Sequence, residues 1–164
     1  MSIMSTIAVR PALAQDEIYL YELYRAVRGP QFDLAPITAE QKESLLRMQF
    51  HAQLSSYTQQ YPNSCYHLVL MDGKPCGRLW VAPGLNSFHL VDIALDPGLQ
   101  SKGIGTVLVQ RLQQEAQKMK LPITSVVDRF NPGSLRFHKR LGFAITREDV
   151  LNYYMEWRPA PLVG

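Results

Sequence analysis

The spacing of apolar residues predicts a chain that mixes helices with short strands. Four segments carry the signals of helices: 15–27, 39–60, 105–120 and 132–141. Segments rich in β-forming residues, which predict strands, are 5–10, 66–71, 76–82, 88–95, 123–127, 143–146 and 150–157. This order predicts a mixed α/β (α+β) sheet, in which the strand at 88–95 runs directly into a glycine turn and a helix.

Local signals place several boundaries of these elements. Thr38 followed by Gln41 forms a capping box for the helix at 39–60, which ends before Pro62. Asp72-Gly73 lies between two strands and predicts a tight hairpin turn. Gly142 follows the helix at 132–141 and is expected to end it.

Length and composition favour one soluble domain. The 164 residues show no internal repeat or linker, and 46% hydrophobic with 19% charged residues is usual for a globular protein. We therefore expect a single domain over 1–164, with its core at about 5–158. The N-terminal residues lack the features of a secretory leader, and no run of about eighteen apolar residues occurs, so we expect a cytoplasmic protein without a membrane partner.

Charge is distributed unevenly along the chain. The net charge of +3 is too small to indicate nucleic-acid binding. However, residues 98–147 contain nine Lys or Arg and only two acidic residues, whereas the rest of the chain is net acidic. This pattern suits an anionic cofactor on the C-terminal half, although an uneven solvated surface is the alternative. Cys65 and Cys76 lack the spacing of a redox or metal site, so we expect reduced thiols and no metal.

The segment from Gln100 to Thr106 (QSKGIGT) is the strongest candidate for chemistry. Its glycines allow a tight turn, and the backbone amides at the start of the following helix can bind phosphate. We expect this loop to hold a pyrophosphate, although a simple helix-start turn has the same pattern. The chain contains no P-loop motif, and Val107 and Leu108 stand where a dinucleotide fingerprint needs a third glycine.

In this segment the chain resembles the GNAT family of N-acetyltransferases, as a small bacterial-type single-domain member. The family's motif Q/R-x-x-G-x-G/A appears as Gln100-x-x-Gly103-x-Gly105, after a strand end and an Asp-Pro pair. A second segment, NPGSLRFHKRLGF at 131–143, is similar to the family pattern N-x-x-A/S-x-x-F-Y-x-x-x-G-F. The order of elements also fits the family fold, in which the first strands form a mostly antiparallel meander and the strands at 88–95 and 123–127 form a parallel pair that splays to hold coenzyme A.

The resemblance implies acetyl-CoA as co-substrate and a set of residues that bind it. The turn and the first helical residues would bind the pyrophosphate, the main chain of the strand at 88–95 would pair with the pantetheine arm and polarise the thioester, and the second motif would contact the arm. These residues are Gln100, Ser101, Lys102, Gly103, Ile104, Gly105 and Thr106; Ile93, Ala94 and Leu95; and Asn131, Ser134 and Phe137.

Acetyl transfer to an amine also needs groups that move protons. A lysine-like amine is protonated at neutral pH, so a base must take its proton. His89 lies where histone-modifying family members keep a glutamate base, and Asp92 is a carboxylate inside an apolar run. An exposed histidine and a hydrogen-bonded structural carboxylate are the alternatives. His138 stands where the family usually has a tyrosine acid, and Tyr153 or Tyr154 is the alternative donor.

These features predict direct acetyl transfer to a primary amine, without a covalent enzyme intermediate. Four acidic residues, Asp33, Glu40, Glu43 and Asp92, weakly favour a cationic small-molecule or peptide acceptor. Two other functions remain open: a module that senses acyl-CoA without catalysis, and an interaction domain that has lost the ligand. The sequence separates neither acetyl from longer acyl donors nor a monomer from a homodimer, which is expected only by analogy.

Overall fold

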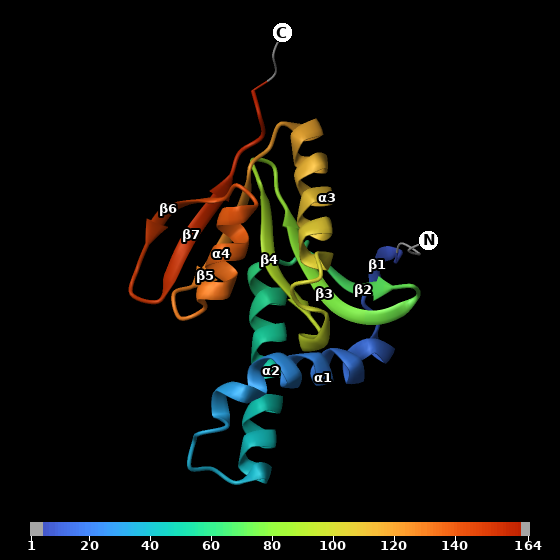
Figure 1. The fold of residues 1–164 in the computed structure, drawn as a ribbon, viewed down its shortest axis with the longest axis vertical. Coiled ribbons are helices and arrows are strands. Elements are labelled where there is room, and N and C mark those ends of the chain that lie inside the picture. Colours follow the sequence, from blue (N-terminus) through green and yellow to red (C-terminus); the bar gives the residue numbers. More distant parts are fainter. Residues whose placement is uncertain (1–4, 162–164) are drawn as a thin grey trace. The chain divides into compact units, whose positions relative to one another are not determined.

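The computed structural model describes residues 5–161, which form seven strands and four α-helices (Figure 1). The strands are β1 (Ile7–Pro11), β2 (Cys65–Met71), β3 (Lys74–Pro83), β4 (Phe88–Leu95), β5 (Ile123–Asp128), β6 (Ala144–Glu148) and β7 (Asn152–Trp157). The helices are α1 (Glu17–Arg28), α2 (Ala39–Gln60), α3 (Ile104–Met119) and α4 (Pro132–Arg140). Every element expected from the sequence is present, with small differences at the ends. Within residues 5–161, no helix is long and apolar enough to cross a membrane.

The seven strands form one mixed sheet in the order β1-β2-β3-β4-β5-β7-β6. β1 pairs antiparallel with β2, and β7 pairs antiparallel with both β5 and β6. β4 and β5 are parallel, with Phe88, His89 and Leu90 opposite Ile123, Thr124 and Ser125. A parallel pair needs a crossover connection, and α3 supplies it. The expected mixed sheet with a parallel pair is therefore confirmed.

The chain divides into two compact units, which are described separately. The N-terminal unit contains the chain up to Trp80 together with Asp92–Lys102. The C-terminal unit contains Val81–Val91 and the chain from Gly103 onward. Both β3 and β4 contribute residues to each unit.

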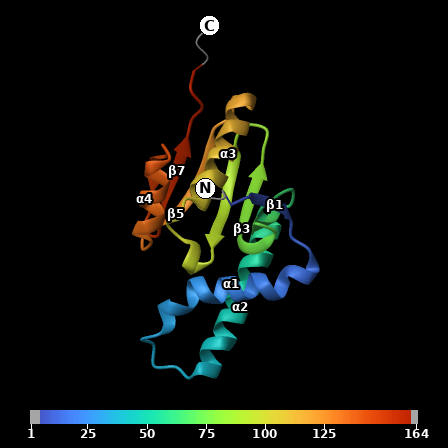
Figure 2. The ribbon, with the colours of Figure 1, turned by 45° about the vertical axis from the view of Figure 1, so that its right-hand side comes forward.

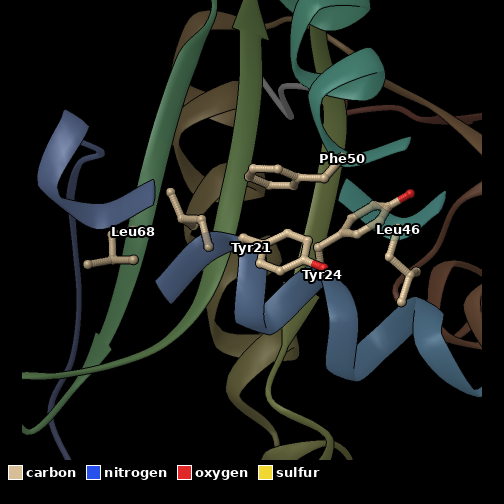
Figure 3. Packing of buried hydrophobic residues seen from close by; sticks show 6 residues of the cluster. Tyr21, Tyr24, Leu46, Phe50 and Leu68 are labelled. Carbon is tan, nitrogen blue, oxygen red and sulfur yellow. The ribbon is translucent and has the colours of Figure 1, made fainter. Parts of the chain in front are cut away.

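The core of the N-terminal unit forms where α1 crosses α2, as Figures 1 and 2 show. Phe50 of α2 is 1% exposed, and the rings of Tyr21 and Tyr24 from α1 lie with their centroids 5.5 and 5.6 Å from its own (Figure 3). Leu46 and Leu68 complete the packing. Burying one such aromatic side chain stabilises the fold by about 2–3 kcal/mol.

Local capping and turn signals are confirmed at the predicted positions. Thr38 Oγ1 accepts a hydrogen bond from the Gln41 amide at 3.1 Å, and Gln41 Oε1 accepts one from the Thr38 amide at 2.9 Å. Asp72 and Gly73 both have positive φ, at 51° and 81°, as a type I′ hairpin turn requires. These interactions are short-range, which is why the sequence predicts them.

The core of the C-terminal unit lies between its strands and its two helices. The apolar residues of β5 and β7 that point inward are buried, and the inner face of α3 is buried too: Ile123, Val127, Met155, Leu108, Val109, Leu112 and Ala116. The end of α4 is a Schellman motif, because the amide of Phe143 donates to His138 O and that of Gly142 donates to Lys139 O, each at 3.0 Å. Gly142 adopts φ 90° there, so it ends the helix as expected.

Candidate active site

The connection from β4 to α3 is a turn with two left-handed residues, Ser101 at φ 64° and Gly103 at φ 85°. Gly103 is the N-cap of α3, and no side chain caps this helix end. The Val107 amide donates to Gly103 O at 3.0 Å and so closes the first turn of the helix. The preceding amides of the first turn have no acceptor within the helix. This helix end can therefore bind an anion through its backbone and its dipole.

The residues of the predicted pyrophosphate loop differ in exposure. Gln100, Ser101, Lys102 and Gly103 are exposed, Thr106 is half-buried, and Ile104 and Gly105 are buried. Gln100 Nε2 lies 3.5 Å from Leu95 O, which makes it a weak donor back to the end of β4. The turn itself thus faces solvent, while the start of the helix is anchored in the core.

The second half of β4 carries the predicted pantetheine-binding residues. Ile93, Ala94 and Leu95 are all half-buried. A Cβ placed on Gly77 of β3 would lie 2.5 Å from the Ala94 carbonyl oxygen and 2.7 Å from Leu95 Cδ2, closer than real Cβ atoms approach. Only glycine permits this approach, and a glycine inside an apolar strand is the signal that sequence reasoning left unused.

Asp92, a predicted base, is held in a buried ion pair. Its Oδ2 accepts a hydrogen bond from Arg78 Nε at 2.6 Å, and Arg78 donates from its other arm to Gln53 Oε1 of α2, also at 2.6 Å. The side chains of Arg78 and Asp92 are 6% and 18% exposed. Burial works to lower the pKa of Arg78, but the Asp92 carboxylate outweighs it and the pKa is raised. Arg78 therefore stays charged, and Asp92 has the hydrogen-bonding partner that a structural carboxylate at this position needs.

Aromatic side chains lie close to this ion pair, since Tyr57 and Tyr66 both interact electrostatically with Arg78 and Asp92. The Trp80 and Tyr66 rings stack with centroids 4.3 Å apart, and Tyr57 meets Trp80 edge-on at 5.2 Å. The Trp80 indole donates to Ser64 Oγ at 2.6 Å. Burial raises the pKa of both tyrosines, so they remain neutral phenols near pH 7. The largely buried Arg78–Asp92 pair thus lies close to aromatic side chains.

His89, the other predicted base, is half-buried on β4. Its Nδ1 lies 2.8 Å from Thr124 Oγ1 on the neighbouring strand β5. Burial lowers the pKa of His89 below its ordinary value, so the ring is neutral at pH 7. A neutral imidazole has the protonation state that a proton acceptor needs.

His138, the predicted acid, is a buried residue of α4 that is only 4% exposed. Its Nδ1 lies 2.8 Å from the Ser134 carbonyl oxygen, and its Nε2 lies 3.1 Å from Ser125 Oγ of β5. Burial lowers the pKa of His138, and the bond to Ser134 opposes this only in part. Both ring nitrogens are therefore engaged inside the protein.

The remaining residues of the second motif lie near the start of α4. Asn131 is exposed and caps the helix, its Oδ1 accepting from the Ser134 amide at 3.0 Å. Ser134 and Phe137 are half-buried, and the Phe137 ring meets His138 edge-on at 5.5 Å. The predicted small and aromatic positions are therefore partly accessible on one helix.

Tyr153 and Tyr154, the alternative donors, are half-buried on β7. The Tyr154 hydroxyl donates to Asp149 Oδ2 at 2.9 Å, and the Arg147 guanidinium lies 3.7 Å from its ring centroid. Arg129 lies 4.9 Å from the Tyr153 ring centroid. The Tyr154 ring thus stabilises the β6–β7 hairpin and its turn, whereas the Tyr153 ring contacts an arginine that directly follows β5.

Three of the four acidic residues that suggested a cationic acceptor are paired within the protein. Asp33 binds Lys42 at 2.7 Å, Glu43 binds the Tyr21 hydroxyl at 2.7 Å and Arg47 at 3.2 Å, and Asp92 binds Arg78. These partners offset part of the negative charge of the three carboxylates. A cationic acceptor stays a prediction.

The structure brings some of the predicted residues together and also shows partners that the sequence missed. Asp92 shares β4 with the predicted pantetheine segment, and Ser134 contacts His138. Gly77, Arg78 and Ser125 were not predicted. Arg78 could have been noticed as a charge inside an apolar strand, whereas nothing in the sequence marks Ser125. Among residues 5–161, no group of three or more His, Cys, Asp or Glu could hold a metal.

Comparison with known structures gives the fold class. A PaiA N-acetyltransferase from Thermoplasma acidophilum, crystallised with coenzyme A, matches with a TM-score of 0.71 at 19% identity, covering 93% of this chain and 99% of that chain. PseH N-acetyltransferase from Campylobacter jejuni, in complex with acetyl coenzyme A, matches with a TM-score of 0.61 at 18% identity, covering 94% and 100%. An acetyltransferase from Thermus thermophilus matches with a TM-score of 0.67 at 17% identity, covering 93% and 97%. The fold is that of the acetyl-CoA-dependent N-acetyltransferases.

A family model identifies the chain more directly. The model described as the acetyltransferase (GNAT) family matches residues 30–143, which include both motifs. The chain belongs to this family and is an acetyl-CoA-dependent acyltransferase. A comparison with curated protein sequences finds no match.

Proposed function

We propose that this protein transfers an acetyl group from acetyl-CoA directly to a primary amine. The observation that carries the proposal is the turn with left-handed Ser101 and Gly103, which leaves the first amides of α3 uncapped at the family's glycine motif. Two of the structural relatives were crystallised with coenzyme A or acetyl coenzyme A, which supports a binding site of this kind.

Three elements would hold acetyl-CoA, which supplies the acetyl group as a thioester. The amides from Lys102 to Thr106 would bind the pyrophosphate, with Gln100 and Ser101 shaping the turn. The main chain of Ile93–Leu95 would pair with the pantetheine arm like an added strand, and a backbone amide there would stabilise negative charge on the thioester oxygen. Asn131, Ser134 and Phe137 would contact the arm from α4. The excess of basic residues over 98–147 favours an anionic ligand.

His89 and Asp92 are the candidates for taking the proton of the amine. His89 is neutral at pH 7, because burial lowers its pKa, and a neutral imidazole can accept a proton directly or through water. Asp92 is already bound to Arg78 through Oδ2, so its other carboxylate oxygen would have to do this work. The family resemblance makes His138 the proton donor, although its nitrogens both have partners within the protein.

Titration of coenzyme A into wild-type protein and the variant Gly103→Glu tests the cofactor site. The added carboxylate would place negative charge at the helix end, and we expect binding to weaken roughly a hundredfold, as for like charges near a protein surface. Gly73→Glu is the matched control, since Gly73 also has a positive φ and a Cβ there would also meet nothing within 4 Å, but it lies in the β2–β3 hairpin. This control should bind like the wild type.

Equal binding by wild type and Gly103→Glu would contradict the assigned site, and no binding by wild type would overturn the acetyl-CoA proposal. If binding is found, a screen of amines with His89→Gln and Asp92→Asn identifies the base through the pH dependence of kcat/KM. Binding without transfer to any amine would favour an acyl-CoA sensor.

A cytoplasmic location and a homodimer stay predictions.

A further inference from the structure

Two hydroxyl side chains of β5 bind carbonyl groups of β4 along the short parallel ladder. Thr124 Oγ1 donates to Phe88 O at 3.4 Å, and Ser125 Oγ donates to Leu90 O at 3.3 Å. Each hydroxyl also contacts a histidine ring, Thr124 with His89 at 2.8 Å and Ser125 with His138 at 3.1 Å. All of these residues belong to the C-terminal unit. Side chains therefore reinforce this ladder in addition to the main chain.

The Ser125 contacts lie at the last pair of the ladder. The parallel register ends with Leu90 opposite Ser125, while β4 continues to Leu95 and β5 to Asp128. At this last pair the Ser125 hydroxyl adds a side-chain hydrogen bond to the Leu90 carbonyl, at 3.3 Å. Leu90 and Ser125 are thus the last residues at which β4 and β5 pair in the ladder.

The proton positions around His138 follow from its partners. The Ser134 carbonyl can only accept, so Nδ1 carries the proton and Nε2 of the neutral ring is an acceptor. The single hydroxyl proton of Ser125 is then shared between Nε2 and Leu90 O. Ser125 is 4% exposed, as is His138, so no solvent competes for these bonds. The two residues form one closed hydrogen-bonded chain from α4 to β4.

The His138 ring is also fixed by packing. The Phe137 and Phe143 rings meet it edge-on, with centroids 5.5 and 5.2 Å away. In the Schellman motif at the end of α4, the carbonyl of His138 accepts a hydrogen bond from the Phe143 amide, which also fixes the backbone of His138. A ring with both nitrogens bonded and both flanks packed holds its orientation, which suits a positioning role and hinders proton delivery to a ligand.

We propose that His138 is a positioning residue, which acts through Ser125 to fix the end of the β4–β5 ladder and so presents the following β4 backbone to the cofactor. This inference rests on the proposed function, in which Ile93–Leu95 bind the pantetheine arm. It assigns to His138 a role other than the proton donor that its place in the family motif implies. It also assigns a role to Ser125, which lies outside the two motifs described above.

The variants His138→Gln, His138→Ala and Ser125→Ala separate positioning from acid catalysis. The amide of glutamine reaches the place of Nε2 and can bond Ser125, but it does not titrate near neutral pH. We expect His138→Ala and Ser125→Ala each to weaken coenzyme A binding about tenfold, the usual effect of a lost buried hydrogen bond with a partner left unsatisfied. His138→Gln should bind and turn over within about threefold of wild type, with an unchanged pH profile of kcat.

The double variant His138→Ala/Ser125→Ala tests the coupling. If the two residues act as one unit, its loss of binding equals that of either single variant, whereas independent roles give additive losses. Val126→Ala, on the exposed face of the same strand, controls for a shortened side chain on β5 and should bind like wild type. The proposal would be overturned if kcat fell as much in His138→Gln as in His138→Ala while binding stayed intact. That result would favour His138 as the proton donor.

Hydrogen exchange of the ligand-free proteins makes the result independent of the proposed function. Faster exchange of the Phe88–Leu95 amides in His138→Ala and Ser125→Ala, but not in His138→Gln, is expected whether or not coenzyme A binds. If the two alanine variants exchange faster in this way but wild type binds no coenzyme A, the proposed function fails while the positioning of β4 stands. Exchange that is the same in all four proteins would refute the positioning role.

Discussion

At the scale of single residues, Arg78 shows how a buried charge is tolerated. Its guanidinium is bonded to Asp92 on one arm and to Gln53 on the other, and the rings of Tyr66 and Trp80 stack in the same apolar setting. Bringing two charges out of water is costly, and their attraction offsets this cost only when both partners remain. The intact pair therefore adds little to the net stability of the fold, but each of the two residues is costly to bury without the other.

Removing Arg78 alone should destabilise the protein more than removing the whole pair. Arg78→Met leaves the Asp92 carboxylate unpaired, and we expect a loss of about 3 kcal/mol in the free energy of unfolding, measured with urea. The double variant Arg78→Met/Asp92→Leu should recover most of this loss. Lys42→Met, which breaks the exposed pair with Asp33, is the control and should cost less than about 1 kcal/mol. A double variant less stable than Arg78→Met would contradict this account.

At the scale of elements, β4 is divided into two parts with different supports. Its first residues pair with β5 in the C-terminal unit, and its last residues lie against Gly77 in the N-terminal unit. The close approach at Gly77 leaves no space for a side chain behind the Ala94 carbonyl. The position of the proposed pantetheine segment therefore depends on the absence of one methyl group.

Gly77→Ala should displace the end of β4. The added Cβ would meet backbone atoms, which cannot rotate away, and we expect a loss of about 2 kcal/mol in the free energy of unfolding together with weaker coenzyme A binding. Urea unfolding and calorimetric titration measure the two effects. Gly98→Ala is the matched control, because a Cβ there meets nothing within 4 Å, and its stability should change by less than about 0.5 kcal/mol. Unaltered binding in a destabilised Gly77→Ala would show that this contact supports the fold and not the site.

At the scale of the whole molecule, three histidines with lowered pKa make stability depend on pH. Burial lowers the pKa of His67, His89 and His138 below the ordinary value of 6.5. The unfolded chain then binds more protons than the folded chain between the folded pKa values and 6.5, so stability rises with pH across this window. This contribution is complete above pH 6.5 and is lost as the pH falls through the folded values.

Urea unfolding at pH 7.5 and pH 5.5 measures this effect. We expect lower stability at pH 5.5, by about 1.4 kcal/mol for each unit of pKa depression that lies inside the window. His138→Gln should reduce the difference between the two pH values. Equal stability of wild type at both pH values would show that the three rings are not held neutral.

Most of the fold followed from the sequence because its signals are local. The capping box at Thr38, the hairpin turn at Asp72-Gly73 and the helix end at Gly142 each depend on residues within a few positions, and all three are confirmed. The glycine motif likewise marked the turn before α3, and with the second motif it identified the family. Local chemistry and a short motif were sufficient for these features.

The partners of the catalytic candidates were decided only by the tertiary structure. Asp92 meets Arg78 fourteen positions away, and His138 meets Ser125 thirteen positions away. Such pairs depend on strand register and on which face of a helix is buried, and both are set by packing of the whole sheet and not by neighbouring residues. The sequence by itself therefore determined the elements, the family and the position of the glycine turn. The structure decided which charges are already neutralised and which histidine is locked in place, because a side chain's protonation and freedom depend on what surrounds it in space.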